Sequence, residues 1–136
     1  MAGDATRTTI NELLAAARSR LRRLGPQQAC DAMVGGAVLI DIRSEAQLER
    51  DGVIPGAHLV ARNVLEWRLD PASGHSDASL GEGLDRLVIL LCDEGYQSSL
   101  AAATLQDLGF PHATDLIGGF QAWRAAGLSV EPYGPP

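Results

Sequence analysis

The chain has 136 residues, enough for one domain, and its composition of 46% hydrophobic and 21% charged residues excludes an intrinsically disordered segment. No apolar run approaches the roughly 20 residues of a membrane-spanning helix, and residues 1–7 lack the apolar core of a signal peptide. We therefore expect a cytoplasmic protein with no membrane partner. The net charge of −6 argues against a nucleic-acid partner, because phosphate binding requires a basic surface.

The N-terminal segment, residues 1–24, predicts an extension helix that packs on the domain. Thr9 and Glu12 have the spacing of a capping box, so the helix begins after Thr9, and Gly25 with Pro26 ends it. Four arginines lie near its C-terminal end. These four arginines are Arg18, Arg20, Arg22 and Arg23. We interpret them as solvated side chains that complement the helix dipole rather than as an anion-binding patch.

From residue 25 to residue 130, segments of strand and helix type alternate, which predicts one α/β domain followed by a C-terminal tail over 131–136. The expected strands cover 37–40, 58–61, 87–91 and 113–116, and the expected helices cover 27–34, 44–50, 63–67, 98–108 and 120–126. The unbroken apolar run at 87–91 favours a strand buried on both faces of a parallel sheet. We therefore expect a central, mostly parallel sheet of about five short strands with helices on both faces.

Cys92 follows the most apolar predicted strand and precedes a predicted helix. Sites in open parallel sheets form at the carboxyl ends of the strands, and loop amides and a helix dipole at that place favour a thiolate. Gly95 gives the loop the conformational freedom that a tight turn needs. We therefore predict that Cys92 is a reactive centre, whereas Cys30, inside a predicted helix, is interpreted as an inert buried cysteine. A Cys–His hydrolase that uses His58 remains an alternative.

Nothing in the sequence indicates a metal site. Two cysteines are too few for a four-thiolate zinc site, and the three histidines lack the spacing of metal ligands: His58, His75 and His112. All 11 basic residues are arginines, which also excludes Schiff-base chemistry on a lysine.

Four short motifs together resemble the single-domain rhodaneses, a sulfurtransferase family, and they occur in the family's order. The motifs are Asp41-Ile42-Arg43, Ile54-Pro55-Gly56-Ala57, the loop of Cys92 with Gly95 and Ser98, and Gly118-Gly119-Phe120-Gln121-Ala122-Trp123. The resemblance covers roughly residues 25–130 and implies a rhodanese-like fold. The N-terminal helix lies outside it.

The resemblance implies that the Cys92 thiolate attacks the outer sulfur of a donor such as thiosulfate, releases sulfite and carries a persulfide. A thiol or cyanide then takes the sulfur, and a sulfur-relay protein is a further candidate partner. No metal or organic cofactor is required. The implied substrate-binding residues are the loop residues Asp93, Glu94, Gly95, Tyr96 and Gln97, and the structural supports are Asp41 and Ser98. Arg43 in the first motif and Arg62 after the Ile54–Ala57 turn are candidates for binding the donor's oxyanion; the alternative for Arg43 is a structural ion pair with Asp41 or Glu45.

The loop departs from the family pattern in its charge. A basic residue usually follows the cysteine and an arginine stands five positions after it, but here these positions are Asp93 and Gln97, and Glu94 is also acidic. Carboxylates that point inward would repel dianionic thiosulfate, which favours a neutral or protein-bound persulfide donor. A binding or regulatory module with weak or no turnover is therefore the alternative function. Phosphatases of this fold need an arginine six positions after the cysteine, where this chain has Ser98.

Overall fold

A four-stranded parallel sheet forms the centre of the computed structural model, which describes residues 6–134. The strands are β1 (Val38–Asp41), β2 (His58–Leu59), β3 (Val88–Leu91) and β4 (Thr114–Asp115), in the order β2-β1-β3-β4. The parallel α/β architecture is confirmed, although about five strands were expected. Beyond β4, Leu24 makes a single parallel bridge to Leu116, which is too short to count as a further strand.

The central strand β3 is buried along its whole length, as its apolar run predicts. Val88 and Leu90 point into a core on one face, and Ile89 and Leu91 point into a core on the other face. Because both faces are covered, the strand shows no alternation of polar and apolar residues. This double burial holds β3 in place, and Cys92 follows directly at its C-terminal end.

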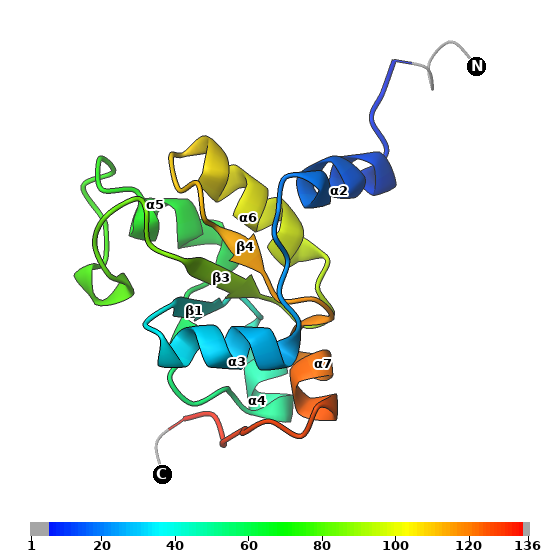
Figure 1. The fold of residues 1–136 in the computed structure, drawn as a ribbon, viewed down its shortest axis with the longest axis vertical. Coiled ribbons are helices and arrows are strands. Elements are labelled where there is room, and N and C mark those ends of the chain that lie inside the picture. Colours follow the sequence, from blue (N-terminus) through cyan, green and yellow to red (C-terminus); the bar gives the residue numbers. More distant parts are fainter. Residues whose placement is uncertain (1–5, 135–136) are drawn as a thin grey trace.

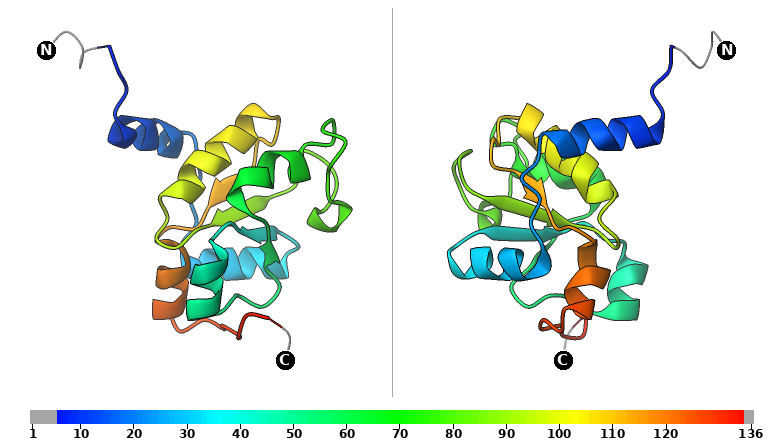
Figure 2. Two further views of the ribbon diagram at one scale, coloured as in Figure 1. Left: turned by 180° about the vertical axis from the view of Figure 1, so that it is seen from behind. Right: turned by 45° about the vertical axis from the view of Figure 1, so that its right-hand side comes forward.

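Helices cover both faces of the sheet (Figures 1 and 2). On one side lie α3 (Pro26–Val34), α4 (Glu45–Asp51) and α7 (Gly119–Ala125), and on the other side lie α5 (Leu65–Leu69) and α6 (Gln97–Asp107). Two 3-10 turns, Arg62–Val64 and Ala78–Leu80, lie in the connections. No helix among the described residues is long and apolar enough to cross a membrane.

The N-terminal helix α2 (Ile10–Ser19) lies against α6, outside the layers that enclose the sheet (Figure 1). Its capping box is present as expected, because the Thr9 side chain accepts a bond from the Glu12 amide and the Glu12 side chain accepts one from the Thr9 amide. The expectation that Gly25 and Pro26 end this helix is wrong, because α2 already ends at Ser19; Leu24 lies at the edge of the sheet, where it bridges to Leu116. Residues 1–5 of the expected extension and 135–136 of the expected tail lie outside the described residues.

Candidate active site

Cys92 lies where the central strand β3 gives way to helix α6. Strand β3 ends at Leu91 and α6 begins at Gln97, so residues 92–96 form a short loop. The Cys92 Sγ atom accepts hydrogen bonds from the amide of Gly95 at 3.2 Å and from the amide of Ser98 at 3.4 Å. Two N–H dipoles at the start of a helix favour a negative charge on this sulfur.

Ser98 contributes more to the sulfur's surroundings than the sequence indicated. Its amide contacts the sulfur, and its hydroxyl oxygen accepts a bond from the Cys92 thiol at 3.3 Å. The same hydroxyl donates to Asp115 Oδ2 at 2.7 Å, and Asp115 is fully buried on β4. A chain of hydrogen bonds therefore runs from the Cys92 sulfur through Ser98 to a buried carboxylate that sequence reasoning missed.

Two arginines of the N-terminal extension hold the outer side of this loop. Arg18 Nη2 donates to the Gly95 carbonyl oxygen at 2.7 Å, and Arg23 Nη2 donates to the same oxygen at 3.0 Å. Arg23 also forms an ion pair with Asp115, with Nε 2.8 Å from Oδ1. The interpretation of these two arginines as solvated side chains is wrong, because α2 and residues 20–24 bring them onto a loop more than 70 positions away in the chain.

A pocket of about 300 Å³ opens beside Cys92. Asp93 lies at its edge, and its Oδ1 atom accepts bonds from Gln121 Nε2 at 2.9 Å and from Arg50 Nη2 at 3.3 Å. The side chain of Glu94 is exposed and makes no hydrogen bond or ion pair in the described part of the chain. The pocket is lined by Ile42, Arg43, Gln47, Cys92, Asp93, Glu94, Tyr96 and Gln97.

Arg43 is buried beside this pocket and is paired with Asp41. Its guanidinium binds both carboxylate oxygens of Asp41, with a shortest distance of 2.6 Å, and the Gly52 carbonyl oxygen at 2.8 Å. The guanidinium carbon also lies 3.8 Å from the centre of the Phe120 ring. The remaining nitrogen, Nη1, is buried and has no hydrogen-bond partner among the described residues. Arg43 is therefore braced by an ion pair and still holds one unused donor.

Arg62 stands elsewhere in the structure. It forms an ion pair with Glu66 at 2.7 Å on the segment that follows β2, and it is not among the described residues that line the Cys92 pocket. The structure thus brings Arg43, but not Arg62, to the site expected from the sequence.

The N-terminus of α7 holds the other side of the Cys92 loop. The amide of Phe120 donates to the Cys92 carbonyl oxygen at 2.9 Å, and the amide of Gln121 donates to the Asp93 carbonyl oxygen at 3.1 Å. This contact requires glycine at position 119, where φ is +62° and a Cβ atom would lie 2.4 Å from the Cys92 carbonyl oxygen. Gly119 therefore lets the backbone of α7 approach the backbone at Cys92 and Asp93.

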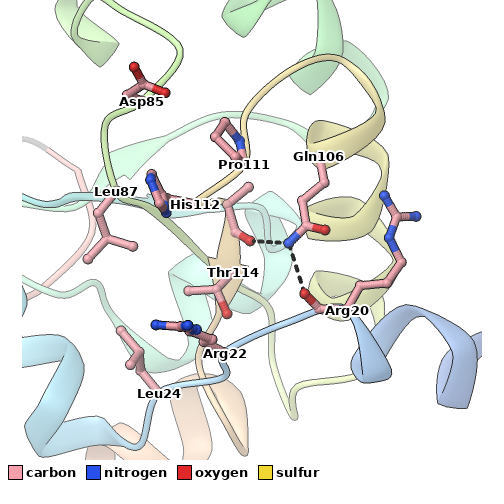
Figure 3. A pocket seen from close by; sticks show the side chains of 10 residues that line it. Arg20, Arg22, Leu24, Asp85, Leu87, Gln106, Pro111, His112 and Thr114 are labelled. Carbon is pink, nitrogen blue, oxygen red and sulfur yellow. Dashed lines mark hydrogen bonds between the residues drawn. The ribbon is translucent and has the colours of Figure 1, made fainter.

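A larger cavity, of about 540 Å³, is shown in Figure 3, and Cys92 is not among the described residues that line it. It opens between residues 20–24 and β4, and no residue of the 92–96 loop lines it.

Among the described residues, no cluster of histidine, cysteine, aspartate and glutamate could hold a metal ion, and no histidine lines the Cys92 pocket. Cys30 is partly buried and lines a separate pocket beside Met33 and Trp123. The geometry therefore gives no support to a Cys–His pair.

An α/β fold with a cysteine in an amide-lined loop at the end of its central strand defines the class of this protein. Residues 26–126 match the family described as the rhodanese-like domain, and the chain belongs to this family. Its fold is that of a single rhodanese domain.

Several similar proteins carry sulfurtransferase names. The chain is 33% identical over 107 residues to thiosulfate sulfurtransferase GlpE of Ectopseudomonas mendocina (strain ymp), an alignment that covers 79% of this chain and 88% of the relative. It is 35% identical over 98 residues to adenylyltransferase and sulfurtransferase MOCS3-2 of Zea mays, covering 72% of this chain but 19% of that longer protein.

Solved structures show the same fold. A protein of unknown function from Rhodopseudomonas palustris CGA009, described as a possible tyrosine phosphatase, is similar with a TM-score of 0.82 and 36% identity, covering 93% of this chain and 96% of that one. A thiosulfate sulfurtransferase from Pseudomonas aeruginosa has a TM-score of 0.64 and 28% identity, covering 83% of this chain and 20% of that one.

Proposed function

We propose that this protein is a sulfurtransferase that carries sulfane sulfur as a persulfide on Cys92. The observation that carries the proposal is that the Cys92 sulfur accepts bonds from the amides of Gly95 and Ser98 and that Cys92 lines a pocket. Nucleophilic catalysis by cysteine requires a thiolate that is both stabilised and reachable. The sulfurtransferase names of the relatives support the same reaction class.

The proposed first step forms one sulfur–sulfur bond and breaks another. The Cys92 thiolate attacks the outer sulfur of a donor such as thiosulfate, and sulfite leaves with the electron pair of the broken bond. The negative charge then rests on the terminal sulfur of the Cys92 persulfide. Backbone amides that point into the loop stabilise this charge, as an oxyanion hole stabilises an oxyanion.

The proposed second step returns the enzyme to its starting state. A thiolate or cyanide attacks the terminal sulfur, and the electron pair of the persulfide bond returns to Cys92 as a thiolate. Since the first product leaves before the acceptor reacts, ping-pong kinetics follow. The maize relative, whose name joins a sulfurtransferase to an adenylyltransferase, supports a protein acceptor in a sulfur relay as a candidate physiological partner.

Arg43 is proposed to contact the donor as a hydrogen-bond donor rather than as a free positive charge. Its charge is balanced by Asp41, but Nη1 is buried without a partner among the described residues, and Arg43 lines the pocket. A buried N–H group that lacks a partner gains a charge-assisted bond when an anionic oxygen of the donor arrives. Asp41 then serves to brace the guanidinium.

The acidic loop favours the second candidate, a binding module with weak or no turnover. Two observations weaken the argument that the acidic loop repels an anionic donor. Arg50 and Gln121 bind the Asp93 carboxylate, and Glu94 is exposed to solvent, which screens its charge. A phosphatase, suggested by the description of the Rhodopseudomonas protein, fits less well. Ser98 occupies the place of the oxyanion-binding arginine, and its hydroxyl already bonds to Asp115.

The test is intact-protein mass spectrometry after incubation with thiosulfate. We expect wild type and the matched control Cys30→Ser to gain the mass of one sulfur atom, and we expect cyanide to remove it. Cys92→Ser should gain nothing. An adduct that persists in Cys92→Ser would refute the assignment of the nucleophile. Absence of an adduct in wild type with thiosulfate and with organic persulfide donors would favour the binding module.

A further inference from the structure

We propose that the N-terminal extension is a working part of the sulfur-transfer site, in which Arg18 and Arg23 position the Cys92 loop. This inference rests on the proposed function for its kinetic consequences, but its geometric basis is independent of the substrate. Both arginines act through the loop rather than on the reacting atoms, so they are positioning residues.

The first support is that both guanidinium groups meet at one backbone oxygen. Arg18 and Arg23 donate to the Gly95 carbonyl at 2.7 and 3.0 Å, and the amide of the same residue donates to the Cys92 sulfur at 3.2 Å. A carbonyl fixed by two charged donors restricts the backbone of its residue. The two arginines therefore help to determine the direction in which the Gly95 amide points.

The second support is the buried carboxylate of Asp115, which connects Arg23 to Ser98. Asp115 accepts from Arg23 Nε at 2.8 Å, from the Ser98 hydroxyl at 2.7 Å and from the Ser99 hydroxyl at 2.7 Å. Arg18 Nε donates to the same Ser99 hydroxyl at 3.2 Å. A buried carboxylate without a cation would be strongly unfavourable and would oppose a thiolate nearby. Arg23 supplies the cation that balances Asp115.

The third support is that the extension is itself held firmly at the edge of the sheet. The Leu24 amide donates to the Asp115 carbonyl oxygen at 3.1 Å, and the Leu24 carbonyl oxygen accepts from the Ile117 amide at 2.8 Å. Further along, Gln106 Nε2 bridges the carbonyl oxygens of Arg20 and Ala113 at 3.2 and 3.1 Å (Figure 3). These bonds hold the backbone of residues 20–24 in place, and this helps to fix the positions from which the two arginine side chains reach the loop.

The chain offers a matched control on the same extension. Arg20 forms an ion pair with exposed Asp107 on α6 at 2.6 Å and does not contact the loop. Arg20→Gln therefore removes a surface ion pair between the extension and α6, whereas Arg18→Gln and Arg23→Gln remove contacts with Gly95. All three variants remove one positive charge from the extension. If activity falls in Arg18→Gln and Arg23→Gln but not in Arg20→Gln, the cause is therefore the lost contact with the loop and not the lost charge.

The experiment compares sulfur transfer from thiosulfate to cyanide in the full-length chain. We expect Arg18→Gln and Arg23→Gln each to lower kcat/KM about tenfold, because each removes charge-assisted bonds that orient the sulfur's environment. The loss should lie in kcat rather than in KM, since neither side chain lines the substrate pocket. Arg20→Gln should stay within about twofold of wild type. Arg23→Lys, which restores the charge opposite Asp115, should recover part of the loss.

A second readout follows the reactivity of Cys92 itself. The rate of alkylation by iodoacetamide is measured against pH in a Cys30→Ser background, so that Cys92 alone reports. Arg18→Gln and Arg23→Gln should both move the midpoint of this profile to higher pH, because each loosens the Gly95 amide that bonds to the sulfur. Arg23→Gln also leaves Asp115 without its cation, which further disfavours the thiolate. Among the described residues, the charged and titratable groups around the sulfur and its loop are Arg18, Arg23, Asp41, Arg43, Arg50, Asp93, Glu94, Tyr96 and Asp115.

Wild-type kinetics and a wild-type alkylation profile in folded Arg18→Gln and Arg23→Gln variants would overturn the proposal. If Arg23→Gln does not fold, Arg18→Gln decides, because it keeps the Arg23–Asp115 ion pair. If the wild-type chain transfers no sulfur, the proposed function fails, whereas the alkylation profile still decides the positioning role.

Discussion

Asp93 is an acidic residue of the Cys92 loop that also lines the pocket beside Cys92. Its carboxylate does not point freely into the pocket, because Gln121 and Arg50 bind the same oxygen. Arg50 is itself shared with Asp51, to which it donates at 2.7 Å. The positive charge opposite Asp93 is therefore only partial, and some repulsion of an anionic donor remains.

We predict that Asp93→Asn raises kcat/KM for thiosulfate about threefold at low ionic strength, the size of effect usual for one partly exposed charge. The asparagine oxygen can still accept from Gln121, so the loop keeps that support. The gain should be smaller for a monoanionic thiosulfonate donor than for dianionic thiosulfate, and it should decline as salt is added.

Glu94→Gln provides the control for this prediction, because Glu94 lines the same pocket but is exposed. Its effect should be smaller than that of Asp93→Asn. Equal gains for both donors, or a gain that does not depend on salt, would show that charge repulsion is not the cause.

At the scale of elements, the contact between the Cys92 loop and the N-terminus of α7 joins two backbones directly. The carbonyl oxygens of Cys92 and Asp93 accept bonds from the amides of Phe120 and Gln121 in the first turn of α7. No side chain fits between these two backbones at Gly119. The helix thus supports the loop from below, while the extension holds it from the outside.

We predict that Gly119→Ala destabilises the protein by about 3 kcal/mol, since it combines backbone strain at positive φ with a steric clash against the Cys92 carbonyl oxygen. Gly127→Ala separates these two effects, because Gly127 also has a positive φ, +77°, but a Cβ atom there would have no neighbouring atom within 4 Å among the described residues. Its cost should be about 1 kcal/mol. Urea unfolding measures both, and equal losses would refute the steric part of the argument.

The elements with local signals were predictable from the sequence. The apolar run at 87–91 identified β3, and the Thr9 and Glu12 pair identified the start of α2. The end of α2 was less predictable: its apolar pattern continues to Leu24, but the helix stops at Ser19 and Leu24 pairs with the edge of the sheet at Leu116. A tertiary contact overrides helical periodicity there.

In the candidate site too, residues with a local sequence signal were predictable, whereas residues positioned by tertiary contacts were not. Cys92 could be placed from its position after a buried strand, since that signal is local. Asp115 gave no signal, because a single carboxylate in a short strand is indistinguishable from a surface residue. Arg18 and Arg23 were visible, but their contact with Gly95 depends on how α2 packs against α6, which no local pattern encodes.

At the scale of the whole molecule, the Cys92 loop joins segments from both ends of the chain. The extension binds Gly95, α7 binds the carbonyls of Cys92 and Asp93, and Arg50 of α4 reaches the Asp93 side chain. The loop takes its shape largely from these neighbours. Its geometry is therefore coupled to the stability of the complete fold.

The link between α4 and α7 predicts how that stability depends on pH. A hydrogen bond from Arg50, with further help from Gln121 and Arg124, lowers the pKa of Asp51 from 3.8 to about 2. Because the folded pKa is depressed, this stabilisation is fully present above the unfolded value near 3.8 and is lost as pH falls toward about 2. Asp51→Asn should therefore lower the melting temperature at pH 7, and its deficit should shrink between about pH 4 and about pH 2.

Glu49→Gln, on the exposed side of α4, is the control for Asp51→Asn and should show no such change. Both variants remove one carboxylate from the same helix, so a general effect of net charge would appear in both melting curves. Asp51 accepts bonds from Gln121 and Arg124 of α7 at 2.9 and 3.2 Å, whereas Glu49 bonds to neither of these two residues in the described part of the chain. A deficit of Asp51→Asn that stays constant down to about pH 2 would show that the charge of this carboxylate does not stabilise the fold.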